Sequence, residues 1–374
     1  MSRPTQAVVS LPNLRHNVGL LRARLRPETG YMAVVKANAY GHGMERVALA
    51  ALEAGASMLG VAFAEEGLRL RRAGIDAPIL LLGIAEEESL DAILEHALTP
   101  TVCDCRTLRL LQARAAARHA RCRVHLKVDT GMRRIGFISL DAFGEALTLL
   151  KASPNLEFHG LFTHFAVSEL EDGRFTRLQG ERFCAFAAAA REAGFSPLLH
   201  AANSGAILNH PALQFDLVRG GIAMYGYHPA GRPAPGLDLR PVMRFVTRIA
   251  FIKPLAPGEG VSYGLRFTAD RPMRVATLPV GYGDGYRRAL SGRADVLIRG
   301  RRARQIGTIC MDQMLCDLSD IPDAAVGDEV VLIGAQGGER ITADELAELA
   351  GTISYEILLG IDSRVPRVYT EEAD

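Results

Sequence analysis

The sequence predicts an α/β fold in which an N-terminal (β/α)8 TIM barrel is followed by a mostly β C-terminal domain. Eight short apolar runs alternate with longer amphipathic stretches in the first part of the chain, and eight strands alternating with helices is the count of a TIM barrel. A stretch rich in proline and glycine then interrupts the pattern, and short β-like runs dominate beyond it. An open doubly wound sheet is the alternative, but no GxGxxG follows the first strand. We therefore favour the barrel.

The barrel elements follow from the hydrophobic periodicity. The predicted strands are residues 31–36, 58–61, 78–82, 98–102, 123–128, 156–163, 198–201 and 215–219. The predicted helices between them are residues 44–54, 64–73, 86–96, 104–119, 141–151 and 175–193. Two helix boundaries carry local signals, because Asp104 can cap one start and Gly74 follows another end.

The domain boundary falls in residues 228–236, which hold too many prolines and glycines for a helix or a strand. We assign residues 10–230 to the barrel and residues 237–374 to the β domain, which residues 1–9 could join. The predicted elements of the second domain are strands at 243–252, 273–280, 295–298, 305–309 and 329–333 and a helix at 342–350.

Composition narrows the function. The 374 residues are 48% hydrophobic, enough for a two-domain core, and their formal net charge of +1 gives no reason to expect nucleic acid or a membrane as partner. A small-molecule substrate is expected instead. The first 18 residues lack the apolar core of a secretory signal, and no run reaches a membrane span, so a cytoplasmic protein is predicted. Six scattered cysteines without a CxxC pair predict free buried thiols and no metal site.

The most informative single residue is Lys36. It follows the apolar run 31–35 and precedes a small-residue turn with Gly41 and Gly43, so it should lie at the carboxyl mouth of the first barrel strand, where barrel enzymes keep their chemistry. Most such lysines are solvated surface charges. A desolvated lysine, however, loses its proton easily and attacks carbonyl groups. Tyr40 follows four residues after Lys36, with Asn38 and small residues between them.

Several motifs resemble those of the alanine racemase family, in the family's order and at predicted strand ends. They are VVKANAYGHG at 34–43, DTGMRRIG at 129–136, THFA at 163–166, RGGIAMYG at 219–226, VSYG at 261–264 and CMDQ at 310–313. The resemblance covers nearly the whole chain. Two departures are Arg133, where a smaller residue is common, and Thr308, where many members carry arginine.

The resemblance implies a pyridoxal 5'-phosphate cofactor bound covalently to Lys36. The other cofactor-binding residues that it implies are Tyr40, His164, Asn203, Ser204, Arg219, Gly221, Ile222 and Tyr355. Arg219 would face the pyridine nitrogen, and His164 would orient Arg219. From residue type alone, Asn203 and Ser204 fit a phosphate site and a helix cap about equally well; the phosphate sites that recur after barrel strands seven and eight favour the former.

The resemblance also implies how substrate is handled. Arg134, Met311 and Asp312 would bind the substrate carboxylate, and Lys127 would be carbamylated and would brace Arg134. A guanidinium fork suits a planar carboxylate.

The implied reaction interconverts L- and D-alanine with two bases, Lys36 for the D-alanine α-proton and Tyr263 of the neighbouring subunit for that of L-alanine. A homodimer with shared sites follows, and D-alanine for peptidoglycan would be the product. Two alternatives remain open: an amino-acid decarboxylase with the same barrel and β domain, and a non-catalytic pyridoxal-phosphate-binding protein made of the barrel alone.

Overall fold

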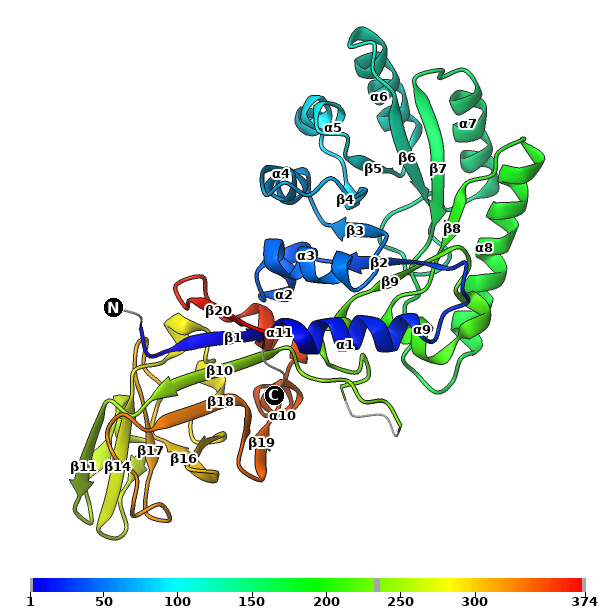
Figure 1. The fold of residues 1–374 in the computed structure, drawn as a ribbon. Helices are drawn as coiled ribbons and strands as arrows, with labels where there is room; N and C mark the ends of the chain where they lie inside the picture. Colours follow the sequence, from blue (N-terminus) through cyan, green and yellow to red (C-terminus); the bar gives the residue numbers. More distant parts are fainter. Residues whose placement is uncertain (1–2, 232–235, 372–374) are drawn as a thin grey trace.

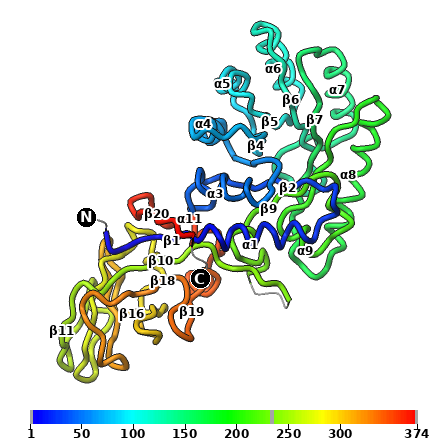
Figure 2. Tube along the Cα trace, in the orientation of Figure 1, coloured from blue at the N-terminus to red at the C-terminus, as the bar shows by residue number. Residues whose placement is uncertain are grey.

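Two parts of the chain are distinct in the computed structural model, which describes residues 3–231 and 236–371. The helices and parallel strands of the first part form one body, and the strands of the second part form another beside it (Figure 1). The continuous trace in Figure 2 shows that the N-terminal segment starts in the second body and crosses into the first along α1 (Leu11–Arg22).

The first part is a barrel of eight parallel strands. In spatial order they are β2 (Gly30–Val34), β3 (Met58–Val61), β4 (Ile79–Ile84), β5 (Thr99–Val102), β6 (Cys122–Lys127), β7 (Leu156–Phe162), β8 (Leu198–His200) and β9 (Leu217–Gly220), which pairs with β2. Between β8 and β9, Asp216 N donates to Leu199 O at 3.0 Å and Arg219 N donates to Ala202 O at 2.9 Å. The strands therefore return to their starting point, which confirms the barrel and rules out the open sheet.

Helices surround the barrel strands (Figure 1). They are α1, α3 (Met44–Glu53), α4 (Ala64–Arg72), α5 (Leu90–Glu95), α6 (Cys105–Ala117), α7 (Leu140–Lys151), α8 (Arg174–Glu192) and α9 (Ser204–Asn209). Asp104 caps α6 as predicted, because its carboxylate accepts from Thr107 N at 2.7 Å. The helix predicted at 86–96 is instead a short 3-10 turn, η1 (Glu87–Ser89), followed by α5.

The second part is built on a ten-stranded, mainly antiparallel sheet. Its main path is β11 (Phe251–Leu255), β14 (Met273–Leu278), β17 (Met314–Asp317), β16 (Arg301–Ile306), β15 (Asp295–Ile298), β18 (Glu329–Gln336), β10 (Met243–Arg248), β1 (Gln6–Ser10) and β20 (Arg367–Thr370). Smaller elements are β19 (Glu339–Ile341), the pair β12 (Gly260–Val261) and β13 (Phe267–Thr268), and the helices α10 (Ala343–Ala350) and α11 (Ser354–Leu359). The N-terminal strand β1 lies inside this sheet.

Some predictions for the second part were wrong. The single strand predicted at 243–252 is two strands, because the chain changes partner between them: Ile249 N donates to Asp328 O, whereas Ala250 N donates to Thr277 O. The strand predicted at 305–309 is the end of β16. The domain limits 10–230 and 237–374 stay predictions, and residues 232–235 of the predicted linker lie outside the described residues.

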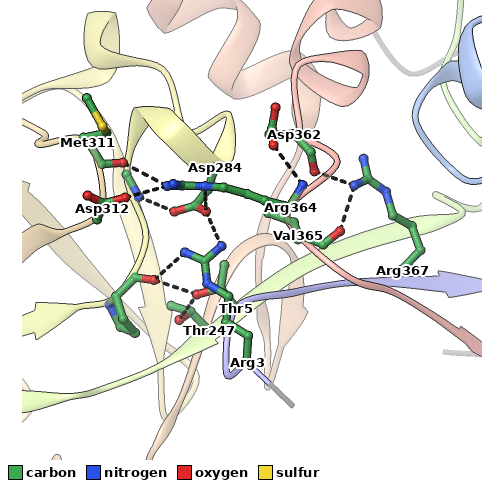
Figure 3. Close-up of polar contacts among 12 residues, drawn as sticks. Arg3, Thr5, Thr247, Asp284, Met311, Asp312, Asp362, Arg364, Val365 and Arg367 are labelled. Atoms are coloured by element: carbon green, nitrogen blue, oxygen red, sulfur yellow. Dashed lines mark hydrogen bonds and ion pairs between the residues drawn. The ribbon is translucent and has the colours of Figure 1, made fainter. Parts of the chain in front are cut away.

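A buried carboxylate ties several distant segments together. Asp284 is fully buried, and its Oδ1 lies 2.5 Å from Arg3 Nη1 and 2.8 Å from Arg364 Nε (Figure 3). The same Arg364 reaches Met311 O at 3.3 Å and Asp312 Oδ1 at 2.9 Å (Figure 3). The segment that carries two predicted substrate-binding residues is thus anchored to residues from both ends of the chain.

Three further findings concern membrane-spanning helices, cysteines and metal ligands. Over residues 3–231 and 236–371, no helix is long and apolar enough to cross a membrane. All six cysteines are free, as predicted, but Cys184 is exposed, and only Cys122 and Cys316 are buried. In the same described parts of the chain, no three histidine, cysteine or acidic side chains gather as metal ligands would.

Candidate active site

Lys36 opens a left-handed turn at the carboxyl end of β2. The strand ends at Val34, and Ala37, Asn38, Ala39 and Tyr40 all have φ between +52° and +55°. L-residues adopt this region reluctantly, at roughly 1–2 kcal/mol each, so neighbouring groups must hold it. The turn, labelled α2 (Lys36–Tyr40), replaces the predicted strand end at 35–36.

Glu66 of α4 is one such group. Its Oε1 accepts from Ala37 N at 2.6 Å and its Oε2 accepts from Ala62 N at 2.7 Å. Desolvation and the charge of Arg134 lower the pKa of Lys36, and the opposite charge of Glu66 limits that fall. The amine is therefore partly desolvated and easier to deprotonate than a surface lysine.

Arg219 is buried beneath this mouth, at the end of β9, with 3% of its surface exposed. Its Nη2 donates to Thr163 O at 2.7 Å and to Ala201 O at 2.8 Å and lies 3.2 Å from Nδ1 of His164. Its Nη1 lies 2.9 Å from Nδ1 of His200. Burial lowers the pKa of Arg219 to about 9, and among the residues that the structure describes every partner of the guanidinium is neutral.

Lys127 and Arg134 extend the row of positive charge. Lys127, at the end of β6, is 4% exposed, and desolvation followed by the charges of Arg219 and Arg134 lowers its pKa to about 7. The guanidinium of Arg134 is exposed and has no hydrogen-bond or ion-pair partner within the described segments. Asp129 shapes its turn by accepting from the backbone N–H groups of Gly131, Arg133 and Arg134 at 2.8–3.0 Å.

The hydroxyl groups of Tyr40 and Ser204 lie close to the backbone of Gly221. A Cβ added to Gly221 would stand 3.1 Å from the Tyr40 hydroxyl and 3.6 Å from Ser204 Oγ. Ser204 Oγ accepts from the backbone N–H groups of Gly221 at 3.0 Å and Ala223 at 3.3 Å, so its own hydrogen is free to donate. Ile222 is buried at the start of the 3-10 turn η3 (Ile222–Tyr225) that follows. These groups would suit a phosphate.

Asn203 fits the capping alternative. Its Oδ1 caps α9 by accepting from Ala206 N at 3.1 Å, and it also accepts from Ser168 Oγ at 2.5 Å. Its amide nitrogen donates to Phe165 O at 3.2 Å. Its side chain shapes the helix start without any ligand.

Tyr355 brings the second part of the chain to the barrel mouth. It lies on α11, and its ring centroid is 5.8 Å from that of Tyr40. A Cβ on Gly41 would stand 2.7 Å from Leu358 O, which shows how closely α11 approaches the left-handed turn. The turn is therefore held from the C-terminal part as well.

Tyr263 lies elsewhere, with 71% of its surface exposed. It belongs to the 3-10 turn η4 (Tyr263–Leu265) and lines a surface hollow of about 600 Å³ together with Met311 and Asp312. The hollow is lined by residues 262–264 and 310–313 alone. Within this chain, one group of predicted site residues lies at the barrel mouth: Lys36, Tyr40, Arg219 and Tyr355. A second group lines the separate surface hollow: Tyr263, Met311 and Asp312.

Sequence reasoning missed Glu66, Asp129 and His200. Asp129 stood inside a quoted motif without a role, and its position five residues before Arg134 is a local turn signal that could have been used. Glu66 and His200 gave no such signal, because their partners are distant in the sequence.

A lysine at the mouth of an α/β barrel that is joined to a mostly β domain defines a two-domain barrel enzyme. Family models agree in detail: residues 9–229 match the alanine racemase N-terminal domain and residues 242–369 match the alanine racemase C-terminal domain. The chain belongs to the alanine racemase family, whose members are isomerases.

Individual relatives support the assignment over the full length. The chain is 48% identical to the alanine racemase of Symbiobacterium thermophilum over 99% of this chain and 98% of that relative. It is 42% identical to the alanine racemase of Halothermothrix orenii over 99% and 97%. Among solved structures, the alanine racemase of Bacillus anthracis with bound L-Ala-P superposes with a TM-score of 0.94 at 36% identity, covering 99% and 96% of the two chains.

Proposed function

We propose that this protein is a pyridoxal-phosphate-dependent alanine racemase that interconverts L- and D-alanine with two bases, Lys36 and Tyr263. The observation that carries the proposal is the carboxyl end of the barrel, where a partly desolvated Lys36, the Tyr40 and Ser204 hydroxyl groups beside Gly221 and the buried Arg219 lie at the ends of β2, β8 and β9. The names of the relatives favour racemisation over the decarboxylase alternative, and the matched C-terminal domain disfavours a single-barrel binding protein.

The residues present fit the cofactor. Lys36 would hold it covalently, Tyr40, Ser204, Gly221, Ile222 and Tyr355 would surround its phosphate, and Arg219, oriented by His164, would face its pyridine nitrogen. Asn203 would act through the α9 start that it caps. When bound to an amino acid, pyridoxal phosphate acidifies the α-C–H bond by delocalising the electron pair that the proton leaves behind.

Arg219 sets the electronic character of the site. A guanidinium donates hydrogen bonds and keeps its own proton, so it would leave the pyridine nitrogen unprotonated. No acidic group among the described residues contacts this guanidinium. The site would therefore favour return of the proton over more extensive electron withdrawal.

Arg134 would orient the substrate by binding its carboxylate. Its free guanidinium is near enough to Lys36 to lower the pKa of that amine, and its fork matches a carboxylate. Met311 and Asp312, which line the surface hollow with Tyr263, would complete the carboxylate site. A carbamylated Lys127 would place an anion near both Arg134 and Arg219, whose charges act on this side chain.

The two bases must stand on opposite faces of the α-carbon. Lys36 would accept the α-proton of D-alanine, and Tyr263 of a second subunit would accept that of L-alanine. A homodimer with shared sites follows. Supply of D-alanine for peptidoglycan and a cytoplasmic location stay predictions.

A chiral assay of the purified, cofactor-loaded protein tests the proposal. L-Alanine should be converted to an equal mixture of enantiomers, Lys36→Ala should abolish conversion, and borohydride reduction should fix the cofactor on the peptide that contains Lys36. Release of carbon dioxide without D-alanine would instead establish a decarboxylase.

A Tyr263→Phe variant tests the assignment of the bases. Deuterium exchange at the α-carbon should fall by at least about 100-fold for L-alanine, as expected when a positioned acid–base group is lost, and far less for D-alanine. Equal loss for both enantiomers would contradict the two-base scheme.

A further inference from the structure

The buried side of Arg219 is joined to a row of three histidines. Arg219 Nη1 lies 2.9 Å from His200 Nδ1, His200 Nε2 lies 2.9 Å from His125 Nδ1, and His125 Nε2 lies 2.9 Å from His159 Nδ1. His200 and His125 are fully buried, whereas His159 is partly exposed. A continuous hydrogen-bonded path thus leads from the candidate active site through β8 and β6 to solvent at β7.

Arg219 fixes the direction of this path. A guanidinium can only donate, so Nδ1 of His200 accepts. A neutral imidazole that accepts at one ring nitrogen donates at the other, so Nε2–H of His200 donates to His125. By the same argument, Nε2–H of His125 donates to Nδ1 of His159. All three rings are therefore neutral with the hydrogen on Nε2.

The surroundings agree with neutral rings. A second proton on any of the three rings would sit on Nδ1. That N–H would then face the N–H group that now donates to it, so two donors would oppose each other. Desolvation, with smaller contributions from His159 and Arg219, lowers the pKa of His125 to about 3, and desolvation and Arg219 lower that of His200 well below its ordinary value. Desolvation and Arg123 also lower the pKa of His159, opposed by Glu157.

The backbone makes room for the central ring. His125 pairs with Gly160 across β6 and β7, and a Cβ on Gly160 would stand 2.4 Å from both Cε1 and Nδ1 of His125. Only glycine permits this ring position. The His200 ring stacks on Phe162 with centroids 4.7 Å apart and planes 6° apart, so the rings next to Arg219 are closely held.

We propose that His125 and His159 are positioning residues, which act through His200 to hold the Arg219 guanidinium in one orientation and to stabilise its charge with aligned lone pairs. Among residues 3–231 and 236–371 no carboxylate contacts Arg219, and a row of neutral imidazoles supplies acceptors that cannot take its proton at neutral pH. Only the consequence for catalysis rests on the proposed function, because it assumes that Arg219 contacts the cofactor. The hydrogen-bonded row itself does not.

Nitrogen-15 NMR of histidine-labelled holoenzyme tests the row directly. At neutral pH, long-range correlation spectra should show His125, His159 and His200 as neutral rings protonated at Nε2. Spectra of His125→Asn and His159→Gln proteins assign the signals. A cationic His125 or His200, or either ring protonated at Nδ1, would overturn the proposal even if racemase activity is present. The expected spectra together with an inactive enzyme would leave the row intact and refute only the proposed function.

Substitutions then test the effect on Arg219. Gly160→Ala should displace the His125 ring and lower kcat by about tenfold, as loss of an outer-shell hydrogen-bond partner does at other sites, with little change in KM and a shift of the cofactor absorption band. Gly144→Ala on α7 is the matched control, because a Cβ there meets nothing within 4 Å.

A pair of variants separates the hydrogen bond from packing. His125→Leu should reproduce the loss, whereas His125→Asn should recover most of it, because Asn Oδ1 can take the place of Nδ1 and accept from His200. Parental kcat and an unshifted absorption band in both Gly160→Ala and His125→Leu would show that the row has no influence on Arg219.

Discussion

At the scale of single residues, the charge state of the Lys127 amine decides whether this side chain can react with carbon dioxide. Lys127 is almost completely buried, its Nζ lies 4.4 Å from the centre of the Phe162 ring, and its pKa is about 7. About half of the molecules would therefore carry a neutral amine at neutral pH. Because Arg219 and Arg134 are the strongest charged neighbours, an anion at this position would be stabilised where a cation is not.

Lys127 should therefore form a carbamate by attack of its neutral amine on carbon dioxide, with one proton released to solvent. Protein equilibrated with carbon-13 bicarbonate should give a carbamate carbon signal that Lys127→Ala lacks. Since only the unprotonated amine reacts, the signal should grow as the pH rises through about 7 and decline below it. A signal that persists in Lys127→Ala would assign the carbamate to another amine.

Residues at strand ends could be predicted from the sequence, because hydrophobic periodicity marks where each barrel strand stops. Lys36 was singled out in this way, whereas His164 and Arg219 were placed at strand ends by the pattern and given their roles by the family resemblance. The groups that hold them could not be: Glu66 contacts the turn from 29 residues away, and His125 and His200 are 75 residues apart. Such contacts exist only once the barrel has closed.

At the scale of elements, the left-handed turn α2 is the least expected feature. Three of its four positive-φ residues are Ala37, Ala39 and Tyr40, which have no preference for that region. Besides Glu66, the turn is held by Asn38, whose side chain accepts from Met44 N at 3.1 Å and whose carbonyl accepts from Gly43 N at 2.9 Å. Strain is thus placed directly after Lys36 and offset by side-chain contacts.

Removing the Glu66 carboxylate should release this turn. Glu66→Ala leaves the N–H groups of Ala37 and Ala62 without their acceptor, and we expect the free energy of unfolding to fall by about 2–4 kcal/mol. Displacement of Lys36 should lower kcat by about 10- to 100-fold. Urea unfolding and the chiral assay measure the two effects.

The neighbouring Glu65→Ala is the control, because Glu65 is exposed on the same helix. It should change the unfolding free energy by less than about 0.5 kcal/mol. Equal destabilisation by the two variants would mean that Glu66 acts through the helix and not through the turn.

The elements also show why the barrel could be predicted more accurately than the β domain. Barrel strands pair with sequence neighbours, so local alternation of strands and helices determines their order. In the second sheet, β1 pairs with β10 and β20, which lie far along the chain. No local pattern contains that pairing, and the missed division between β10 and β11 has the same origin.

At the scale of the whole molecule, Asp284 joins both ends of the chain to the segment that carries Met311 and Asp312. Its carboxylate contacts Arg3 and Arg364 and accepts from Gly281 N at 3.0 Å. The two arginine side chains are 31% and 38% exposed, so water compensates part of their charge when the carboxylate is removed.

Asp284→Asn should lower the free energy of unfolding by about 1.5–3 kcal/mol, the range for hydrogen bonds to charged groups, and raise KM for alanine, since Arg364 also holds Asp312. Denaturant unfolding and steady-state kinetics provide the measurements. The exposed Asp320→Asn serves as control. An unchanged KM despite the stability loss would separate this cluster from substrate binding.

We predict that the exposed surface around Tyr263 contacts a second subunit. Tyr263, Leu265 and Met311 are 71%, 65% and 52% exposed, and Tyr263 and Met311 line the same hollow. Exposed apolar side chains that gather on a surface mark interaction sites. The hollow lined by Tyr263 and Met311 has no lysine in its lining, and no contact among the described residues brings Tyr263 to Lys36. Two copies that exchange these surfaces would complete both sites.

Mixing two inactive variants tests this arrangement. Lys36→Ala and Tyr263→Phe proteins should each be inactive, but a mixed dimer has one site with both substitutions and one with neither. After subunit exchange at equal concentration, half of the dimers are mixed, so about a quarter of the parental kcat should return if sites are shared across a two-fold axis. Mixing Lys36→Ala with the Lys36→Ala/Tyr263→Phe double variant should restore nothing. If exchange is shown by mass labelling and the first mixture stays inactive, Lys36 and Tyr263 must serve the same site from one chain.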